Sequence, residues 1–272
     1  MISDLDVHFA LAIATETIMK AGEILRFRVS ETQVRRKIRH DIVSKADLLA
    51  EKEIVTNLKQ YFPDHVFISE ELPTTQEGTR EFQWIIDPLD GTINYVAGLP
   101  FFSSSIALQK NGETILGVIY DPSANKLYTS IKGTGSFVNN RKLQVSSNSD
   151  LGNSVLSFML TSHYNQEEVN EILKHVEKLS VACRGLRLYV SQALELAYIA
   201  SGKLDGTICV KSRGFSSAAG VLILREAGGK ATDLQGQEFG NGSRSLLATN
   251  SLVHDKIFHA IGRDMNTFRR IK

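Results

Sequence analysis

The sequence predicts a mixed α+β and α/β protein, in which an antiparallel half precedes a half of alternating helices and strands. Short apolar runs separated by turn residues fill residues 66–138, which is typical of an antiparallel sheet. Residues 166–261 instead alternate segments of helical spacing with short strand-like segments. The pattern changes near residues 151–154 without a linker rich in Pro, Gly or Ser. We therefore expect two halves, residues 1–150 and 151–272, that share an interface and form one compact unit.

Two helices and a charged segment are expected at the N-terminus. Residues 4–27 place apolar side chains on one helical face, and residues 47–61 resume the same spacing. Residues 32–45 are rich in charge and predict an exposed loop. The basic cluster there, Arg35-Arg36-Lys37 with Arg39 and His40, is most simply a solvated face of that loop. Its functional alternative is a lid that closes over an anion.

Strands and helices then follow in blocks. The strands expected in the first half are 66–68, 84–86, 103–109, 115–120, 126–130 and 135–138, with turns at Asn111-Gly112 and Asn139-Asn140. In the second half we expect helices over 166–180, 191–202, 217–227 and 253–261, and strands over 204–209, 230–232, 245–248 and around Arg187. Gly133-Thr134-Gly135 lacks the third glycine of a nucleotide loop and predicts a hairpin turn.

Composition indicates an ordinary enzyme of the cytoplasm. The chain has 272 residues, 42% of them hydrophobic, and 31 basic against 30 acidic side chains, so it offers no electrostatic footprint for nucleic acid or an anionic membrane. We expect no signal peptide and no membrane span. The two cysteines, Cys183 and Cys209, lie far apart, which suits a reducing compartment. The seven histidines lack metal-ligand spacing and are expected to be surface or capping residues.

The most informative motif is Trp84-Ile85-Ile86-Asp87-Pro88-Leu89-Asp90-Gly91-Thr92. Two carboxylates flank a proline that is expected to stop the strand, and their close approach requires a cation between them. Gly91 lets the backbone approach a ligand, and Thr92 adds a hydroxyl at an expected helix start. A divalent cation and a phosphate are the natural ligands. The alternative is a simple Asx-type turn, because Asp, Pro and Gly are all turn residues.

In combination with three other segments, this motif resembles the inositol monophosphatase family. The other segments are Ser69-Glu70-Glu71, Asp41 to Asp47, and Ala218-Ala219-Gly220 with Glu226 to Gly229, in the same order along nearly the whole chain. The resemblance implies layers in the order α-β-α-β-α, with the active site where the two halves meet. It also implies an Mg²⁺-dependent phosphomonoesterase and a homodimer.

Carried over by position, the resemblance assigns metal ligands. Glu70, Asp87 and the Leu89 carbonyl would hold one Mg²⁺, and Asp87 with Asp90 would help hold a second.

The resemblance assigns the catalytic and substrate-binding roles in the same way. Asp47 and Thr92 would form a hydrogen-bonded pair, while Thr92 and Glu70 orient and deprotonate the attacking water. The Gly91 and Thr92 N–H groups would receive phosphate oxygens. Asp90, Ser191 and Ser216 are expected to line the substrate site beside them.

The chain departs from the family pattern at several positions. Ser216 stands where the family has an aspartate of the second-metal site, so we expect a weaker second metal and place lithium sensitivity in doubt. The serine is expected to cap a helix that begins at Ser217. Val190 replaces a usual glycine before Ser191, and Cys209 replaces a glutamate that often meets inositol hydroxyls. Arg187, Lys211 and Arg213 are ordinary surface cations or contacts to a second anion of the substrate.

Two functional classes therefore stay open. The first is a working phosphatase of inositol monophosphate-like esters, or of NADP, fructose 1,6-bisphosphate or adenosine 3′,5′-bisphosphate. The second is a catalytically weak family member that binds phosphorylated metabolites or a partner protein, which the loss of the carboxylate at Ser216 favours.

Overall fold

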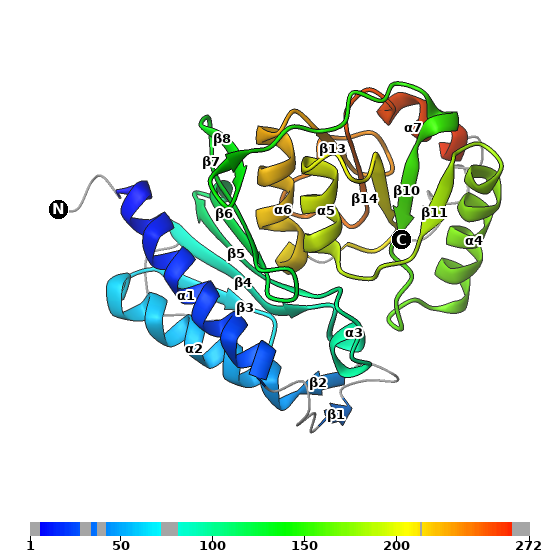
Figure 1. The fold of residues 1–272 in the computed structure, drawn as a ribbon. Helices are drawn as coiled ribbons and strands as arrows, with labels where there is room; N and C mark the ends of the chain where they lie inside the picture. The colour runs from blue at the N-terminus through cyan, green and yellow to red at the C-terminus, as the bar shows by residue number, and fades with distance from the viewer. Residues whose placement is uncertain (1–5, 28–33, 37–41, 72–80, 213, 263–272) are drawn as a thin grey trace.

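The computed structural model describes residues 6–27, 34–36, 42–71, 81–212 and 214–262. Its elements stack in five layers, with two helices outside a large sheet, two helices between this sheet and a smaller one, and two helices on the far side (Figure 1). The helices are α1 (Val7–Phe27), α2 (Lys45–Tyr61), α3 (Thr92–Val96), α4 (Gln166–Ser180), α5 (Gln192–Ala200), α6 (Gly214–Glu226) and α7 (His254–Gly262). This arrangement confirms the predicted α-β-α-β-α fold class.

The large sheet is built from the first half of the chain. Its strands follow the spatial order β3 (Val66–Ser69), β4 (Phe82–Asp90), β5 (Ser103–Lys110), β6 (Glu113–Asp121), β7 (Lys126–Ile131), β8 (Gly135–Val138) and β9 (Arg141–Lys142). Consecutive strands are antiparallel except β3 and β4, which run parallel. Asn111 and Gly112 both have positive φ, as the tight turn between β5 and β6 requires. Gly133 and Thr134 lie in the predicted turn between β7 and β8, and Gly135 begins β8.

The smaller sheet comes from the second half of the chain. Its spatial order is β11 (Gly185–Arg187), β10 (Val155–Phe158), β12 (Gly206–Cys209), β14 (Leu246–Thr249) and β13 (Lys230–Thr232). A short 3₁₀ turn, Leu151–Asn153, precedes β10.

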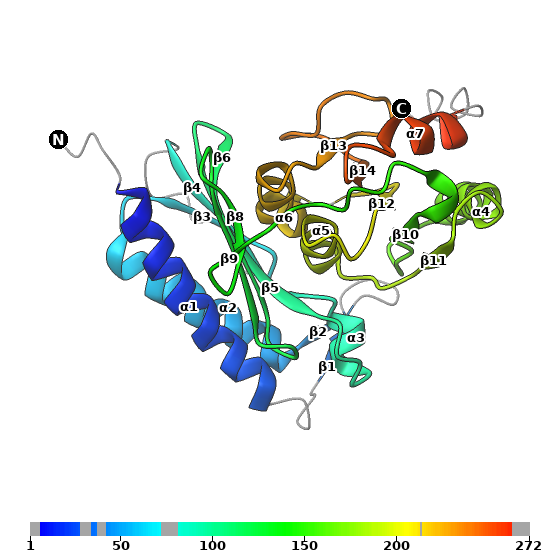
Figure 2. The ribbon, with the colours of Figure 1, turned by 45° about the horizontal axis from the view of Figure 1, so that its top comes forward.

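Three apolar clusters join the five layers. The first packs α1 and α2 on one face of the large sheet, with Trp84 and Leu58 fully buried. The second fills the space on both sides of α5 and α6, from Ile119 in the large sheet to Leu246 in the small one. The third packs α4 and α7 on the outer face of the small sheet. Figure 2 shows α5 and α6 between the two sheets, so the second half of the chain covers the inner face of the first.

Four local expectations about strands were wrong. Pro88 does not stop the strand, because β4 continues to Asp90 across a register shift that accommodates a residue without an N–H. The antiparallel sheet has one parallel pair, β3 with β4. The 32–45 loop contains the antiparallel strands β1 (Val34–Arg36) and β2 (Ile42–Ser44), which high charge concealed. Strand β10 was not predicted, since its four residues are too few to show a period.

Two other expectations concern single residues and the membrane. His175 and His254 are buried, contrary to the expected surface or capping role of the histidines. Lys37, Arg39 and His40 of the basic cluster lie outside the described residues. Within the part of the chain that the structure describes, no helix is long and apolar enough to cross a membrane.

Candidate active site

The candidate site is built at the irregular end of β4. The ladder between β4 and β5 is regular up to Asp87 and shifts before Asp90, so the two aspartates leave the ordinary alternation of a strand. Both side chains are buried and line one cavity with Glu70. The Pro88 carbonyl accepts a hydrogen bond from Ser104 Oγ at 2.7 Å, which fixes the backbone between the two carboxylates.

Asp87 is the deepest of these carboxylates. Burial raises its pKa well above the ordinary value, and the charges of Glu70 and Asp90 raise it further. Ser216 Oγ donates to Asp87 Oδ2 at 2.6 Å, while the buried Oδ1 has no hydrogen-bond partner among the described residues. Ser216 lies within the first turn of α6, which begins at Gly214, so the prediction that it caps a helix starting at Ser217 was wrong. Its hydroxyl faces the carboxylate instead.

Asp90 is held by the start of α5. Its Oδ2 accepts hydrogen bonds from Ser191 Oγ at 2.7 Å and from the Ala193 N–H at 2.8 Å. Burial raises the pKa of Asp90 to about 6, and these hydrogen bonds oppose the rise. A residue from the first half of the chain is therefore oriented by a helix from the second, so the site needs both halves.

Gly91 and Thr92 turn the chain from β4 into α3. Gly91 has φ of 91°, and a Cβ there would lie 3.0 Å from the Phe101 carbonyl oxygen, so glycine is required. Thr92 Oγ1 lies 3.2 Å from Asp47 Oδ1 and 3.0 Å from the Leu89 carbonyl oxygen. The structure therefore brings the predicted pair of Asp47 and Thr92 into contact.

Asp47 also belongs to the capping box of α2. Its Oδ2 accepts hydrogen bonds from the Ser44 N–H and Ser44 Oγ. Burial raises the pKa of Asp47 to about 7, against the effect of these hydrogen bonds. The carboxyl group can thus exchange a proton near neutral pH while its position stays fixed by the helix start.

Glu70 reaches the same cavity from the end of β3. The residues on both sides of it are held by Glu51, a buried side chain of α2. Glu51 Oε1 accepts hydrogen bonds from Ser69 Oγ and from the Glu71 N–H, the latter at 2.9 Å. Sequence patterns gave no reason to single out Glu51, because a glutamate on a helix is usually solvated.

The donor set of this site suits a hard divalent cation. Glu70, Asp87 and Asp90 supply carboxylate oxygens, and the Leu89 carbonyl has a second lone pair beyond its contact with Thr92. The buried, unpaired Asp87 Oδ1 is the observation that fits a cation best, because such an atom is costly without a partner. Among the described residues, no three His, Cys, Asp or Glu side chains are arranged closely enough to hold a metal ion by themselves.

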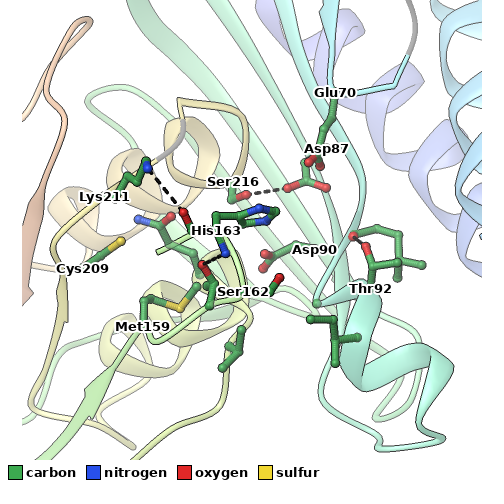
Figure 3. A pocket seen from close by; sticks show the side chains of 16 residues that line it. Glu70, Asp87, Asp90, Thr92, Met159, Ser162, His163, Cys209, Lys211 and Ser216 are labelled. Atoms are coloured by element: carbon green, nitrogen blue, oxygen red, sulfur yellow. Dashed lines mark hydrogen bonds between the residues drawn. The ribbon is translucent and has the colours of Figure 1, made fainter. Parts of the chain in front are cut away.

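The wall of the cavity that faces the carboxylates is lined by a thioether, an imidazole, a thiol and an ammonium group (Figure 3). The cavity has a volume of about 100 Å³, and Met159, His163, Cys209 and Lys211 lie across it from Asp87 and Thr92. Cys209 is buried, and burial raises the pKa of its thiol to about 11, so this side chain is neutral. Sequence reasoning missed Met159, His163 and Gln192, since the loop and helix that carry them have no recognisable motif.

Three cations were considered as contacts to a second anionic group of the substrate, and the structure places one of them, Lys211, at the cavity. Lys211 lines it, and its Nζ lies 3.2 Å from Glu168 Oε1. Arg187 is exposed and donates to the neighbouring Leu186 carbonyl, and it is absent from the cavity lining. Arg213 lies outside the described residues.

The turn before α5 is conformationally unusual. Val190 has φ of 58°, a region in which a β-branched residue is an outlier that costs roughly 1–3 kcal/mol. Its N–H donates to Glu195 Oε1 at 3.1 Å. Glu195 is fully buried and also accepts hydrogen bonds from Ser157 and Thr207, while burial raises its pKa to about 7. Sequence reasoning missed Glu195, although its position within the apolar run 193–200 could have indicated that it is buried.

Comparison with known proteins finds relatives along nearly the whole chain. The model of the inositol monophosphatase family matches residues 6–265. The "Nus factor SuhB" of Pasteurella multocida is 36% identical over 247 residues, which cover 89% of this chain and 90% of that protein. The "Fructose-1,6-bisphosphatase/inositol-1-monophosphatase" of Thermotoga maritima is 34% identical over 254 residues, covering 92% and 95% of the two chains.

A solved structure shows the same fold. The extragenic suppressor protein suhB from Bartonella henselae has a TM-score of 0.88 at 33% identity, covering 93% of this chain and 98% of that one. The members of the family that these matches define are phosphatases that hydrolyse phosphate monoesters. This chain belongs to the inositol monophosphatase family.

Proposed function

We propose that this protein is an Mg²⁺-dependent phosphatase of small alcohol phosphates such as inositol monophosphate. The observation that carries the proposal is the buried carboxylate group of Glu70, Asp87 and Asp90, in which Asp87 Oδ1 has no partner among the described residues. Such a group is stable only with protons or a cation bound. When bound, Mg²⁺ supplies positive charge that stabilises the negative charge on the transferring phosphoryl group.

The residues of the site divide between holding the cation and positioning the phosphate. Glu70, Asp87 and the Leu89 carbonyl would hold one Mg²⁺, and Asp87 with Asp90 would hold a second less strongly, because Ser216 adds no charge. The Gly91 and Thr92 N–H groups would receive phosphate oxygens where β4 ends.

Proton transfer is assigned to the pair of Asp47 and Thr92, with Glu70 beside it. Asp47 is fixed by Ser44, and its pKa of about 7 lets it accept a proton through Thr92 Oγ1, 3.2 Å away, when water attacks the phosphorus. Because water attacks the phosphorus directly, the proposed reaction forms no covalent phosphoenzyme.

The substrate is tested by phosphate release across a panel. Inositol 1-phosphate, fructose 1,6-bisphosphate, NADP and adenosine 3′,5′-bisphosphate would be compared at saturating Mg²⁺. Fructose 1,6-bisphosphate is included because the Thermotoga maritima relative is named for both activities. We expect the highest kcat/KM with inositol 1-phosphate. Release of phosphate from none of the four would contradict the proposal.

A second candidate is a catalytically weak protein that binds phosphorylated metabolites or a partner protein. Ser216 in the second-metal position favours it, and several relatives are titled "Nus factor" rather than phosphatase. Tight binding of inositol 1-phosphate in calorimetry, without Mg²⁺-dependent turnover, would support this candidate.

We also propose a homodimer located in the cytoplasm. The family resemblance supports the dimer, and exposed Ile93, Leu99 and Leu188 are apolar side chains that an interface would cover. The free cysteines Cys183 and Cys209 suit a reducing compartment. Light scattering of the purified protein tests the dimer, and a single monomeric mass would contradict it.

A further inference from the structure

Val190 occupies a backbone conformation that valine rarely adopts. Its φ of 58° lies in the left-handed region, where the branched Cβ is crowded by the backbone. Of the six described residues other than glycine with positive φ, four are asparagine, which tolerates this region, and Val190 is the only one with a β-branched apolar side chain. An outlier of this kind persists only where its surroundings hold it in place.

Three hydrogen bonds from different elements hold the turn that contains Val190. The Tyr189 carbonyl accepts from Asn94 Nδ2 at 2.5 Å, and the Val190 N–H donates to Glu195 Oε1 at 3.1 Å. Ser191 Oγ donates to Asp90 Oδ2 at 2.7 Å. Each residue of the turn is therefore anchored separately, and two of the anchors lie on the chain segment that carries the phosphate-binding turn.

The side chain held in this way lines the candidate active-site cavity. Val190 is half-buried, and it packs against the same apolar cluster as Met159 and Cys209, which also line the cavity. An isopropyl group can hold neither a cation nor a phosphate, so its contribution to the cavity is volume and an apolar surface. The cavity is small, about 100 Å³, and Val190 is one of the side chains that bound it.

We propose that Val190 is a specificity-determining residue, held in a strained conformation so that its side chain narrows the part of the site that receives the alcohol of the substrate. Among small alcohol phosphates, the site thereby favours esters of compact or flexible alcohols such as glycerol over the larger inositol ring, which the site still accepts. This inference rests on the proposed phosphatase function and adds the substrate class to it.

Three variants distinguish the effect of the side-chain volume at position 190 from the effect of the backbone strain there. Val190→Ala removes two methyl groups and keeps a Cβ at positive φ. Val190→Gly removes the same volume and also relieves the strain. Val190→Asn keeps a side chain of similar size in a conformation that asparagine tolerates. Each would be compared with the native protein in kcat/KM for glycerol 2-phosphate and inositol 1-phosphate, and in Tm.

Selectivity and stability should respond differently. We expect the ratio of kcat/KM for inositol 1-phosphate over glycerol 2-phosphate to rise at least threefold in the Ala and Gly variants and to change less than twofold in the Asn variant. Relief of the strain should appear as a shift in Tm, with the Gly and Asn variants melting about 2–4 °C above the Ala variant.

Several results would overturn the inference. A ratio unchanged in both the Ala and Gly variants would show that Val190 does not limit the alcohol, and equal Tm values for the Ala and Gly variants would show that no strain is present. A native protein that hydrolyses neither ester at any Mg²⁺ concentration would instead contradict the proposed function. In that case the Tm comparison still decides whether the turn is strained.

Discussion

A single hydroxyl sets the charge balance around the deepest carboxylate. Ser216 Oγ donates to Asp87 Oδ2 at 2.6 Å, and this hydrogen bond partly offsets the burial and repulsion that raise the pKa of Asp87. A carboxylate at this position would instead add a charge that a second cation neutralises. The family resemblance identified the missing aspartate, but only the structure showed that the Ser216 hydroxyl donates to Asp87 from within the first turn of α6.

Ser216→Asp should therefore strengthen Mg²⁺ binding. We expect the half-saturating Mg²⁺ concentration for phosphate release to fall by roughly threefold or more, because ligand charge tunes affinity. Without Mg²⁺ the variant should melt below the native protein, since like charges meet in a buried site. Ser216→Asn is the matched control, which changes the size similarly but adds no charge. An unchanged Mg²⁺ requirement in the Asp variant would contradict this reading of the site.

The buried side chain of His254 should make the free energy of unfolding depend on pH. It is buried between Thr232 Oγ1 and Thr249 Oγ1, each 3.0 Å from one ring nitrogen. Burial lowers its pKa to about 4, and Lys230 adds to this effect while Asp255 opposes it. In the unfolded chain it would titrate near its ordinary value of about 6.5. Stability should thus be complete above pH 6.5 and be lost as pH falls toward 4, by up to about 3 kcal/mol.

The measurement is the free energy of unfolding as a function of pH. Replacing His254 with Gln should flatten the curve between pH 4 and 6.5, although the variant is less stable at pH 7. His259→Gln on the exposed side of α7 is the control and should leave the slope unchanged. A native slope that persists in the His254 variant would assign the pH dependence to other groups.

At the scale of elements, the packing of α6 on the large sheet depends on a glycine. A Cβ at Gly117 in β6 would lie 2.9 Å from the Ala219 carbonyl oxygen of α6, which is a backbone atom and cannot rotate away. We expect Gly117→Ala to lower the free energy of unfolding by about 1–3 kcal/mol in denaturant titration. Gly240→Ala, where a Cβ would meet nothing within 4 Å, is the control. Equal stability of the two variants would contradict the close contact.

Element prediction from the sequence succeeded where the period was long or the turn chemistry was specific. The helical spacing predicted α2 and α4, and Asn111-Gly112 predicted the turn that the structure shows. It failed where context overrides local preference. The bulge allows Pro88 to remain within β4, and pairing with β2 makes a strand of the charged residues of β1.

Some residues of the candidate site could be predicted from a local motif, and others could not. Asp87, Asp90, Gly91 and Thr92 are adjacent in sequence, so a motif could reveal them together. The contacts of Asp90 with Ser191, and of Asp87 with Ser216, join residues more than 100 positions apart and depend on how α5 and α6 pack. Glu51 escaped prediction because a glutamate on a helix is usually solvated, and Glu195 was missed although it stands within an apolar run.

At the scale of the whole molecule, the middle layer joins the two halves of the chain. Helices α5 and α6 cover the inner face of the large sheet, and their apolar cluster includes Ile85 and Tyr128 from that sheet. We expect the protein to unfold in one cooperative transition, with residues 1–150 alone failing to give one, because that inner face would be exposed. Calorimetry of both chains tests this. A cooperative transition for residues 1–150 alone would contradict it.

We propose that the buried carboxylate site binds Mg²⁺ and uses it to hydrolyse a phosphate ester. The most direct measurement is phosphate release from inositol 1-phosphate across an Mg²⁺ titration, with the native protein beside Asp90→Asn. We predict turnover that is absent without Mg²⁺, saturates with it, and falls by a factor of about 100 or more in the variant. Turnover independent of Mg²⁺, or retained in Asp90→Asn, would contradict the assignment of this site.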